Sequence, residues 1–251
     1  MKTDPTPLLL ALLALLPACA GSAPAATDPM PAPAEAAAPA EPSEESVQPG
    51  INANFLSEDL DVERFVRTFE GESREIAVHH REILAALGLR EGRAVADVGA
   101  GTGLFLASLA EAVGPDGRVW AVDISPRFVE HLERRAQQEG LSQVQVVRCS
   151  EDSVELPAAS VDAALVCDTY HHFEYPRSTL ASLHAALRPG GRLVVVDFER
   201  IPGVSREWTL DHVRAGKEVF RSEIEAAGFR FEDELEIPGM EENYLLRFRR
   251  P

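Results

Sequence analysis

The sequence predicts an α/β protein built on a seven-stranded sheet that is mostly parallel and ends in an antiparallel hairpin. Three observations support this fold class. A glycine-rich loop follows a valine-rich run at residues 95–103, apolar strand-like runs then alternate with helical patterns, and the last two strand-like runs are joined by a short link. Alternating strands and helices are typical of parallel sheets with right-handed crossovers, whereas a short link between strands requires an antiparallel pair.

The glycine loop comes first in this argument. Asp97 ends the valine-rich run, glycines follow at every second position (Gly99, Gly101 and Gly103), and helical spacing begins after Leu104. Glycine tolerates a positive φ and lets a ligand lie against bare backbone, and the amides that open the helix point at whatever lies above the strand. A second strand then ends in Asp123, the position of a ribose-binding acid in nucleotide sites.

The spacing of the loop narrows the class of ligand. The dinucleotide fingerprint requires a glycine where this chain has Leu104, and no P-loop lysine follows the loop. A carboxylate at Asp97 would repel phosphates and attract a cation. The loop therefore favours a nucleoside with a positively charged group over a diphosphate or triphosphate.

This pattern, Asp97-x-Gly99-x-Gly101-x-Gly103 followed by Asp123, resembles the first two motifs of class I S-adenosylmethionine-dependent methyltransferases. The Leu-Arg-Pro-Gly-Gly turn at 187–191 is a further match, and the chain is most similar to small-molecule methyltransferases of the quinone-biosynthesis type. The resemblance implies a Rossmann-like, doubly wound sheet and S-adenosyl-L-methionine as the cofactor. It also implies the cofactor-binding residues, namely Asp97, Gly99, Ala100, Gly101 and Gly103 at the methionine end, Asp123 and Ile124 at the ribose, Asp152 or else Glu151 at the adenine, and Asp168 at the transferred group.

The elements of the core, residues 91–251, follow from the hydrophobic pattern. Ser125 and Pro126 are suited to the N-cap and first position of a helix that runs to Gly140. Further helices are expected at 104–113 and 211–227. Strands are expected at 93–97, 118–122, 144–149, 161–167, within 187–198, at 229–237 and at 244–248.

Catalytic candidates follow the fourth strand, at the carboxyl edge of the sheet, where open α/β sheets bind ligands. They are Asp168, Tyr170, His171 and His172. One histidine could act as a general base or orient the methyl acceptor, while the structural alternative makes both histidines helix-start and packing residues. Adjacent histidines in a strand-like stretch face opposite ways, so we expect no metal site here.

We expect residues 51–90 to form a helical N-terminal extension, in which a longer helix runs from about residue 73 to near Gly88. Its polar groups (Glu70, Arg74, His79, His80 and Arg81) could be a solvated face, or the extension could cover the cofactor and substrate pocket.

The first fifty residues have two patterns of their own. Residues 1–20 resemble a secretory signal, and Leu16-Pro17-Ala18-Cys19 resembles a bacterial lipobox, although Ala18-Cys19-Ala20 also fits a plain cleavage site. Residues 21–50 are rich in alanine, proline and acids and predict a disordered linker. We therefore expect export to the periplasm or anchoring through a lipidated Cys19, and a cytoplasmic location only if the signal is not used.

Composition limits the partners and the rival functions. The formal net charge of −17 disfavours nucleic acid as a partner. The resemblance implies a small-molecule methyl acceptor, while the oligomeric state stays open. Because an exported domain meets little S-adenosylmethionine, the main alternative is a non-catalytic ligand-binding module on the same fold. A nicotinamide-dependent oxidoreductase is disfavoured by Leu104 and by the terminal hairpin.

Overall fold

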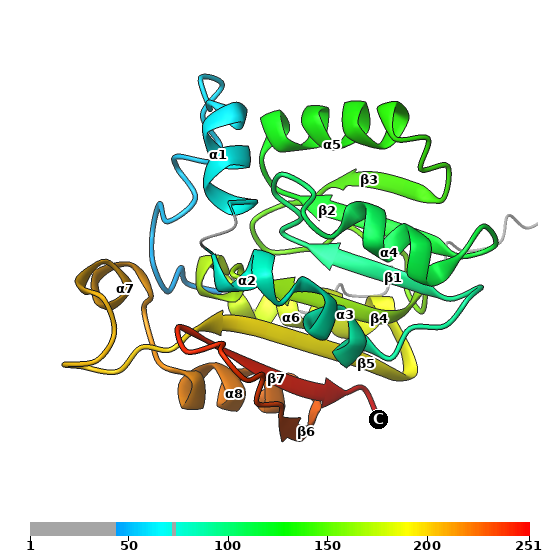
Figure 1. The fold of residues 1–251 in the computed structure, drawn as a ribbon. Helices are drawn as coiled ribbons and strands as arrows, with labels where there is room; N and C mark the ends of the chain where they lie inside the picture. Colours follow the sequence, from blue (N-terminus) through cyan, green and yellow to red (C-terminus); the bar gives the residue numbers. More distant parts are fainter. Residues whose placement is uncertain (1–43, 72–73) are drawn as a thin grey trace, which may run out of the picture. The chain divides into compact units, whose positions relative to one another are not determined.

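The computed structural model describes residues 44–71 and 74–251, which contain a seven-stranded sheet with helices on both faces (Figure 1). The strand order is β3-β2-β1-β4-β5-β7-β6. The pairs among the first five strands are parallel, and β7 is antiparallel to both β5 and β6. The predicted fold class, a Rossmann-like sheet with a C-terminal antiparallel hairpin, is confirmed.

The elements follow the predicted alternation of strand and helix. The strands are β1 (Ala94–Val98), β2 (Arg118–Asp123), β3 (Val144–Arg148), β4 (Val161–Cys167), β5 (Leu187–Phe198), β6 (Arg230–Glu234) and β7 (Asn243–Arg249). The helices are α1 (Val62–Phe69), α2 (Glu75–Val78), α3 (His80–Leu87), α4 (Leu106–Val113), α5 (Pro126–Gln138), the 3₁₀ helix η1 (Tyr170–His172), α6 (Pro176–Ala186), α7 (Glu207–His212) and α8 (Lys217–Ala226).

Two apolar layers hold the helices to the sheet. Successive residues of a strand point to opposite faces, so Val95 of β1 joins the layer under α3, α4 and α5, while Ala96 joins the layer under α6 and α8. Buried leucines and phenylalanines such as Leu109 and Phe220 fill these layers and are not exposed to solvent. This burial fixes the carboxyl ends of β1, β2 and β4 side by side, which is where the candidate site lies.

Three predicted boundaries need correction. The helix expected from about residue 73 is divided at His79 into α2 and α3, and the helix expected over 211–227 is divided into α7 and α8, with Gly216 as the N-cap of α8. Residues 44–50, predicted as linker, contact the domain instead. The Glu44 carboxylate accepts hydrogen bonds from the amides of Arg177 and Ser178 at the start of α6.

The signal-like segment with Cys19 and the linker up to residue 43 lie outside the described residues, so predictions about them stay predictions. Among the helices that the structure describes, none has the length and apolar character that crossing a membrane requires.

Candidate functional site

The glycine loop connects β1 to α4 and is held against β2. The amides of Gly99 and Ala100 donate to the Val122 carbonyl at 2.8 and 3.0 Å. Gly99 has a φ of +74°, and a Cβ there would lie 2.3 Å from the side chain of Thr169, which follows β4. Only glycine satisfies both the backbone angle and this close approach. The loop is therefore fixed between the ends of β1, β2 and β4.

Two buried carboxylates flank the loop. Asp123 accepts hydrogen bonds from Gly101 N and Ser125 N, both at 2.8 Å, whereas Oδ2 of Asp97 is buried without a partner among the described residues. Burial, together with the neighbouring charge of Asp123, raises the pKa of Asp97 to about 7. Burial also raises the pKa of Asp123 to about 6, against the lowering effect of its backbone hydrogen bonds. An orphaned, buried carboxyl of this kind is suited to a cationic group of a ligand.

The acids proposed for the adenine lie on the loop after β3 and are exposed. Asp152 accepts a hydrogen bond from the Ser150 hydroxyl at 2.7 Å, and the backbone carbonyl of Glu151 accepts one from Thr179 at 3.3 Å. Neither contact selects one acid over the other. Ile124 follows Asp123 directly and is partly buried.

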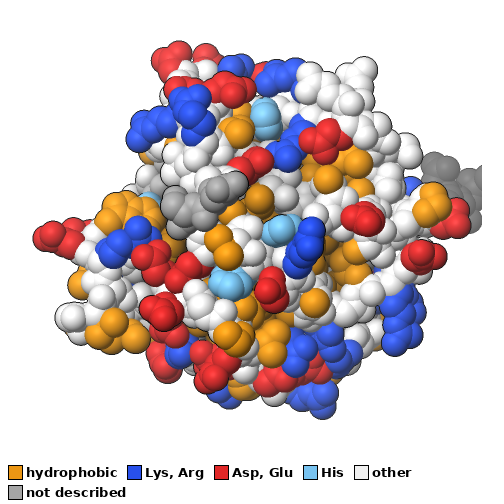
Figure 2. Space-filling model, in the orientation of Figure 1, with side chains coloured by type: hydrophobic (Ala, Val, Ile, Leu, Met, Phe, Trp, Pro, Cys, Tyr) orange, Lys and Arg blue, Asp and Glu red, His pale blue; other side chains and the backbone are white. Residues whose placement is uncertain are grey.

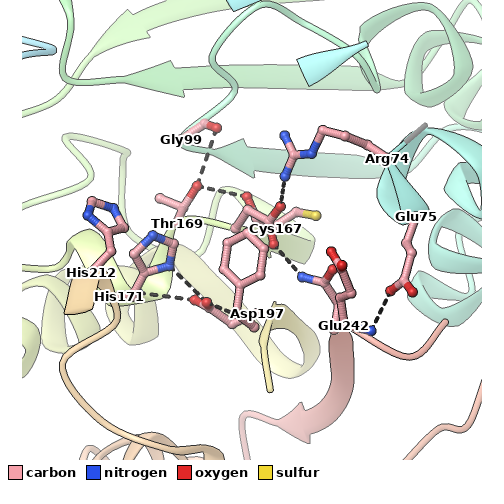
Figure 3. Close-up of polar contacts among 12 residues, drawn as sticks. Arg74, Glu75, Gly99, Cys167, Thr169, His171, Asp197, His212 and Glu242 are labelled. Carbon is pink, nitrogen blue, oxygen red and sulfur yellow. Dashed lines mark hydrogen bonds and ion pairs between the residues drawn. The ribbon is translucent and has the colours of Figure 1, made fainter. Parts of the chain in front are cut away.

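Asp168 follows β4 and is held by residues far away in the sequence. It has a φ of +48°, an unfavourable backbone angle for a residue with a side chain. Arg74 pairs with its Oδ2, and Nδ2 of Asn243 donates to its Oδ1 at 2.7 Å (Figure 3 shows Arg74 reaching toward the end of β4). Burial raises the pKa of Asp168 to about 6, although Arg74 opposes the shift. Strain and convergent polar contacts at one residue are typical of functional positions.

Tyr170 is the candidate that the structure places elsewhere. Its side chain is fully buried against Phe173 and Phe220, and its hydroxyl donates to Glu223 Oε2 at 2.9 Å. Burial strongly raises the pKa of this hydroxyl. The sequence could not distinguish this core position from a surface one, and Tyr170 is left out of the catalytic set below.

The two adjacent histidines do not face opposite ways. They lie on η1 rather than in a strand, and their ring centroids are only 4.3 Å apart. His212 at the end of α7 joins them, with its Nε2 3.3 Å from Nε2 of His172. These three residues, His171, His172 and His212, are called the histidine cluster below. The argument against two ligands on one ion was therefore wrong in its geometry.

Asp197 of β5 orients one member of the histidine cluster, His171. Its fully buried carboxylate accepts from His171 N at 3.1 Å and is 2.8 Å from His171 Nδ1 (Figure 3 shows His171 between Asp197 and His212). Burial alone would lower the pKa of His171, but Asp197 outweighs it and raises that pKa. Burial and the neighbouring histidines lower the pKa of His172, and burial lowers that of His212.

The N-terminal extension contacts the glycine loop and Asp168. Phe69 of α1 lies within about 4 Å of the position that a Cβ on Gly101 would take. Glu70 pairs with Arg135 at 2.6 Å, and Arg135 also donates to the Thr102 carbonyl at 2.9 Å. The extension thus contacts the loop, while its role as a cover for the cofactor and substrate pocket stays a prediction.

Four residues at this carboxyl edge of the sheet were not predicted from the sequence as part of the site: Phe69, Asp197, His212 and Asn243. Asp197 was visible as an acid inside an apolar strand, which is a signal that could have found it. Phe69, His212 and Asn243 stand in segments whose local pattern gives no sign that they return to this edge.

The charge of the face shown in Figure 2 is mixed. Lys and Arg side chains are interspersed with Asp and Glu there, rather than gathered into one basic patch. The expectation that the partner is a small molecule rather than a nucleic acid stays a prediction.

Comparison with known proteins supports this interpretation of the loop. Residues 95–191 match the family described as a methyltransferase domain. The chain is similar to a crystal structure of a SAM-dependent methyltransferase from Aquifex aeolicus, with a TM-score of 0.68, 24% identity, and coverage of 76% of this chain and 99% of that one. The fold is thus that of the methyltransferases, and family match and fold together indicate S-adenosylmethionine as the cofactor.

Curated relatives match over a shorter segment. An uncharacterized 37.1 kDa protein in a Streptomyces fradiae transposon is 39% identical over 113 residues, which are 45% of this chain and 32% of that protein. The ubiquinone/menaquinone biosynthesis C-methyltransferase UbiE of Cupriavidus taiwanensis is 26% identical over 118 residues, 47% of this chain and 48% of that protein. The matched segment thus spans less than half the length of either relative.

Proposed function

We propose that this chain, whose residues 95–191 form a methyltransferase-family domain, transfers a methyl group from S-adenosylmethionine to a small molecule. When bound, the cofactor supplies an electrophilic methyl group on a sulfonium. The observation that carries the proposal is the glycine loop beside Asp97, whose buried Oδ2 has no partner in the described part of the chain. A buried carboxyl without a partner is costly in the unliganded protein, and a cationic ligand removes that cost.

The residues beside the loop fit the rest of such a cofactor. Each Asp123 oxygen already accepts one backbone amide, and each keeps a further lone pair with which to accept a ribose hydroxyl. The methionine end is proposed to lie against the backbone of Gly99 to Gly103, and Asp152 or Glu151 would accept from the adenine amino group.

The acceptor is proposed to lie over Asp168 and the histidine cluster. Asp168 is held in place by Arg74 and Asn243, and His171 is oriented by Asp197. Both arrangements position a carboxylate or an imidazole that can take a proton from an acceptor. Positioning of the acceptor against the methyl donor can itself supply much of the barrier reduction.

Cofactor binding is tested by titrating S-adenosylhomocysteine and NAD separately into wild-type protein and into Asp123→Ala in a calorimeter. Wild type should bind S-adenosylhomocysteine and not NAD, and Asp123→Ala should lose at least tenfold in affinity. Glu130→Ala, on the exposed face of α5, is the matched control and should bind as wild type does. Preference for NAD, or equal affinity in wild type and Asp123→Ala, would contradict the proposal.

The alternative is a ligand-binding module that does not turn over, which an exported location would favour. Incubation with S-adenosylmethionine carrying a labelled methyl group and a panel of phenols, quinols and thiols separates the two. A labelled product that Asp168→Asn fails to form supports the enzyme. Tight S-adenosylhomocysteine binding with no labelled product from any acceptor class supports the module.

We also propose export and anchoring through a lipidated Cys19, which rests on residues 1–20 of the sequence alone. Mass spectrometry of mature protein from a bacterial membrane fraction tests it. A diacylglyceryl group on Cys19 that Cys19→Ser lacks supports anchoring, and an intact Met1 terminus contradicts it.

A further inference from the structure

We propose that the histidine cluster, which lies beside the glycine loop, binds a divalent transition metal. Zn²⁺ is the best match. The chain has seven histidines, and three of them offer ring nitrogens that all lie within 4.8 Å of one another. Imidazole nitrogens are preferred ligands of zinc, and three histidines with one open position form a typical catalytic zinc site.

The distances fit one ion. Nε2 of His172 and Nε2 of His212 are 3.3 Å apart. Two nitrogens bound to one tetrahedral zinc at about 2.0–2.1 Å each lie about 3.3–3.4 Å from one another. The same separation would suit a hydrogen bond between the two rings, so the remaining observations decide between a metal and a simple contact.

Asp197 is the first of these observations. It engages His171 through Nδ1, at 2.8 Å, and so leaves Nε2 of His171 as the ligand atom. Metal-binding histidines characteristically donate their other ring N–H to a carboxylate, which fixes the ring and raises its basicity. Asp197 has no exposed surface, so it is a fixed part of the site rather than a solvated acid.

Aromatic residues outside the histidine cluster pack against two of its rings. Phe55 packs edge-on against His172 with centroids 5.1 Å apart, and Trp208 stacks on His212 at 4.7 Å. Nδ1 of His172 is buried and has no hydrogen-bond partner among the described residues. This atom is not the Nε2 that would bind the metal, so packing against Phe55, rather than a polar partner, holds the His172 ring in place.

The position of the cluster suggests what the metal does. Thr169, whose side chain touches Gly99, accepts a backbone hydrogen bond from His172 N at 2.9 Å, so the cluster lies next to the cofactor loop. An open coordination position there would take a hydroxyl or thiol of the acceptor and favour its deprotonated form. Because Nε2 of His171 would then be a ligand, Asp168 rather than His171 would take the proton. This role rests on the proposed methyl transfer, whereas the metal site itself does not.

The test measures metal directly on the full, untagged chain. After bound metal is removed by chelation and the protein is dialysed against Zn²⁺, inductively coupled plasma mass spectrometry should find about one zinc per wild-type chain. Protein loaded with Co²⁺ instead should show the intense visible absorption bands of a tetrahedral site. His212→Gln should lower zinc affinity at least a hundredfold, and Asp197→Asn, through the orientation of His171, should lower it about 10–100-fold. His184→Gln, which lies on α6 and packs against Phe229, is the matched control and should bind zinc as wild type does.

Folding and function are separated by two readouts. Circular dichroism establishes that each variant is folded, and His212 is only partly buried, so His212→Gln should remain so. Zinc binding is measured without cofactor, so a failed methyl-transfer assay leaves the metal result standing. A wild-type chain that takes up no zinc or cobalt, or a folded His212→Gln that binds zinc as tightly as His184→Gln, overturns the proposal.

Discussion

The glycine loop and the histidine cluster lie at the same edge of the sheet but are assembled from different parts of the chain. The loop, Asp97 and Asp123 all belong to one strand–helix–strand unit, and the contacts of the loop are mostly backbone hydrogen bonds. The acceptor side instead joins His172 to His212, 40 positions apart, and Asp168 to Arg74, 94 positions apart. The cofactor half depends on local geometry, whereas the acceptor half depends on the tertiary fold.

The largest expected effect comes from a substitution in the glycine loop, which belongs to the local, cofactor half of the site. Gly99→Ala adds a Cβ where Thr169 leaves no room and where φ is +74°, whereas Gly140→Ala meets no atom within 4 Å at a similar φ of +68°. Strain at a left-handed backbone angle costs about 1–2 kcal/mol, which both variants bear. Gly99→Ala adds the clash and should cost about 3–5 kcal/mol in total.

Urea denaturation and cofactor titration check this pair. Gly99→Ala should also lose S-adenosylhomocysteine binding, while Gly140→Ala keeps it. Equal losses of stability in the two variants would show that the loop tolerates a side chain and that its glycine pattern is not required by Thr169.

The second prediction concerns the pH dependence of cofactor affinity. Because burial raises the pKa of Asp97 to about 7, its carboxyl must lose a proton before it attracts a cationic ligand. Affinity for S-adenosylmethionine should therefore rise about tenfold per pH unit below 7 and level off above it. Asp97→Asn should weaken binding at pH 8 and remove most of this pH dependence, as calorimetry between pH 5.5 and 8 would show.

The same pKa has an opposite consequence for the unliganded fold. A carboxyl whose pKa is higher in the folded chain stabilises the fold at pH values below its unfolded pKa, and that stability is lost as the pH rises through 7. Asp97→Asn should therefore be more stable than wild type at pH 8, measured without cofactor. If the wild-type chain is instead more stable than Asp97→Asn at pH 8, the Asp97 carboxyl does not have a raised pKa in the folded protein.

The contrast between the two halves explains how much could be predicted from the sequence. The alternation of strands and helices, the loop and Asp123 were predictable because turn chemistry and spacing act within a few residues. The pairing of Asp168 with Arg74 and Asn243, and of His172 with His212, depends on where α2, α7 and β7 pack, which hydrophobic periodicity does not specify. Tyr170 and the adjacent histidines were misplaced for one reason: a 3₁₀ turn, rather than an extended segment, follows β4.

The third prediction tests the tertiary half through Arg74. Its pairing with the part-buried Asp168 connects the N-terminal extension to the acceptor side. Arg74→Ala leaves that carboxylate without its cation and should cost about 1–3 kcal/mol. Arg127→Ala removes an exposed pair with Glu130 and should change stability by less than about 0.5 kcal/mol. Urea denaturation compares the two, and equal effects would mean that the extension is not held to the site by this contact.

The smallest expected effect concerns Glu44, which lies upstream of the extension predicted to begin at residue 51. The Glu44 carboxylate accepts from the amides of Arg177 and Ser178 at 2.9 and 2.7 Å, and so caps α6, which packs under the sheet. Loss of a helix cap costs about 0.5–2 kcal/mol, so Glu44→Ala should lower the melting temperature by a few degrees. The adjacent, exposed Glu45 is the matched control, and Glu45→Ala should melt as wild type does. If both variants melt alike, the Glu44 cap contributes nothing measurable to the stability of α6.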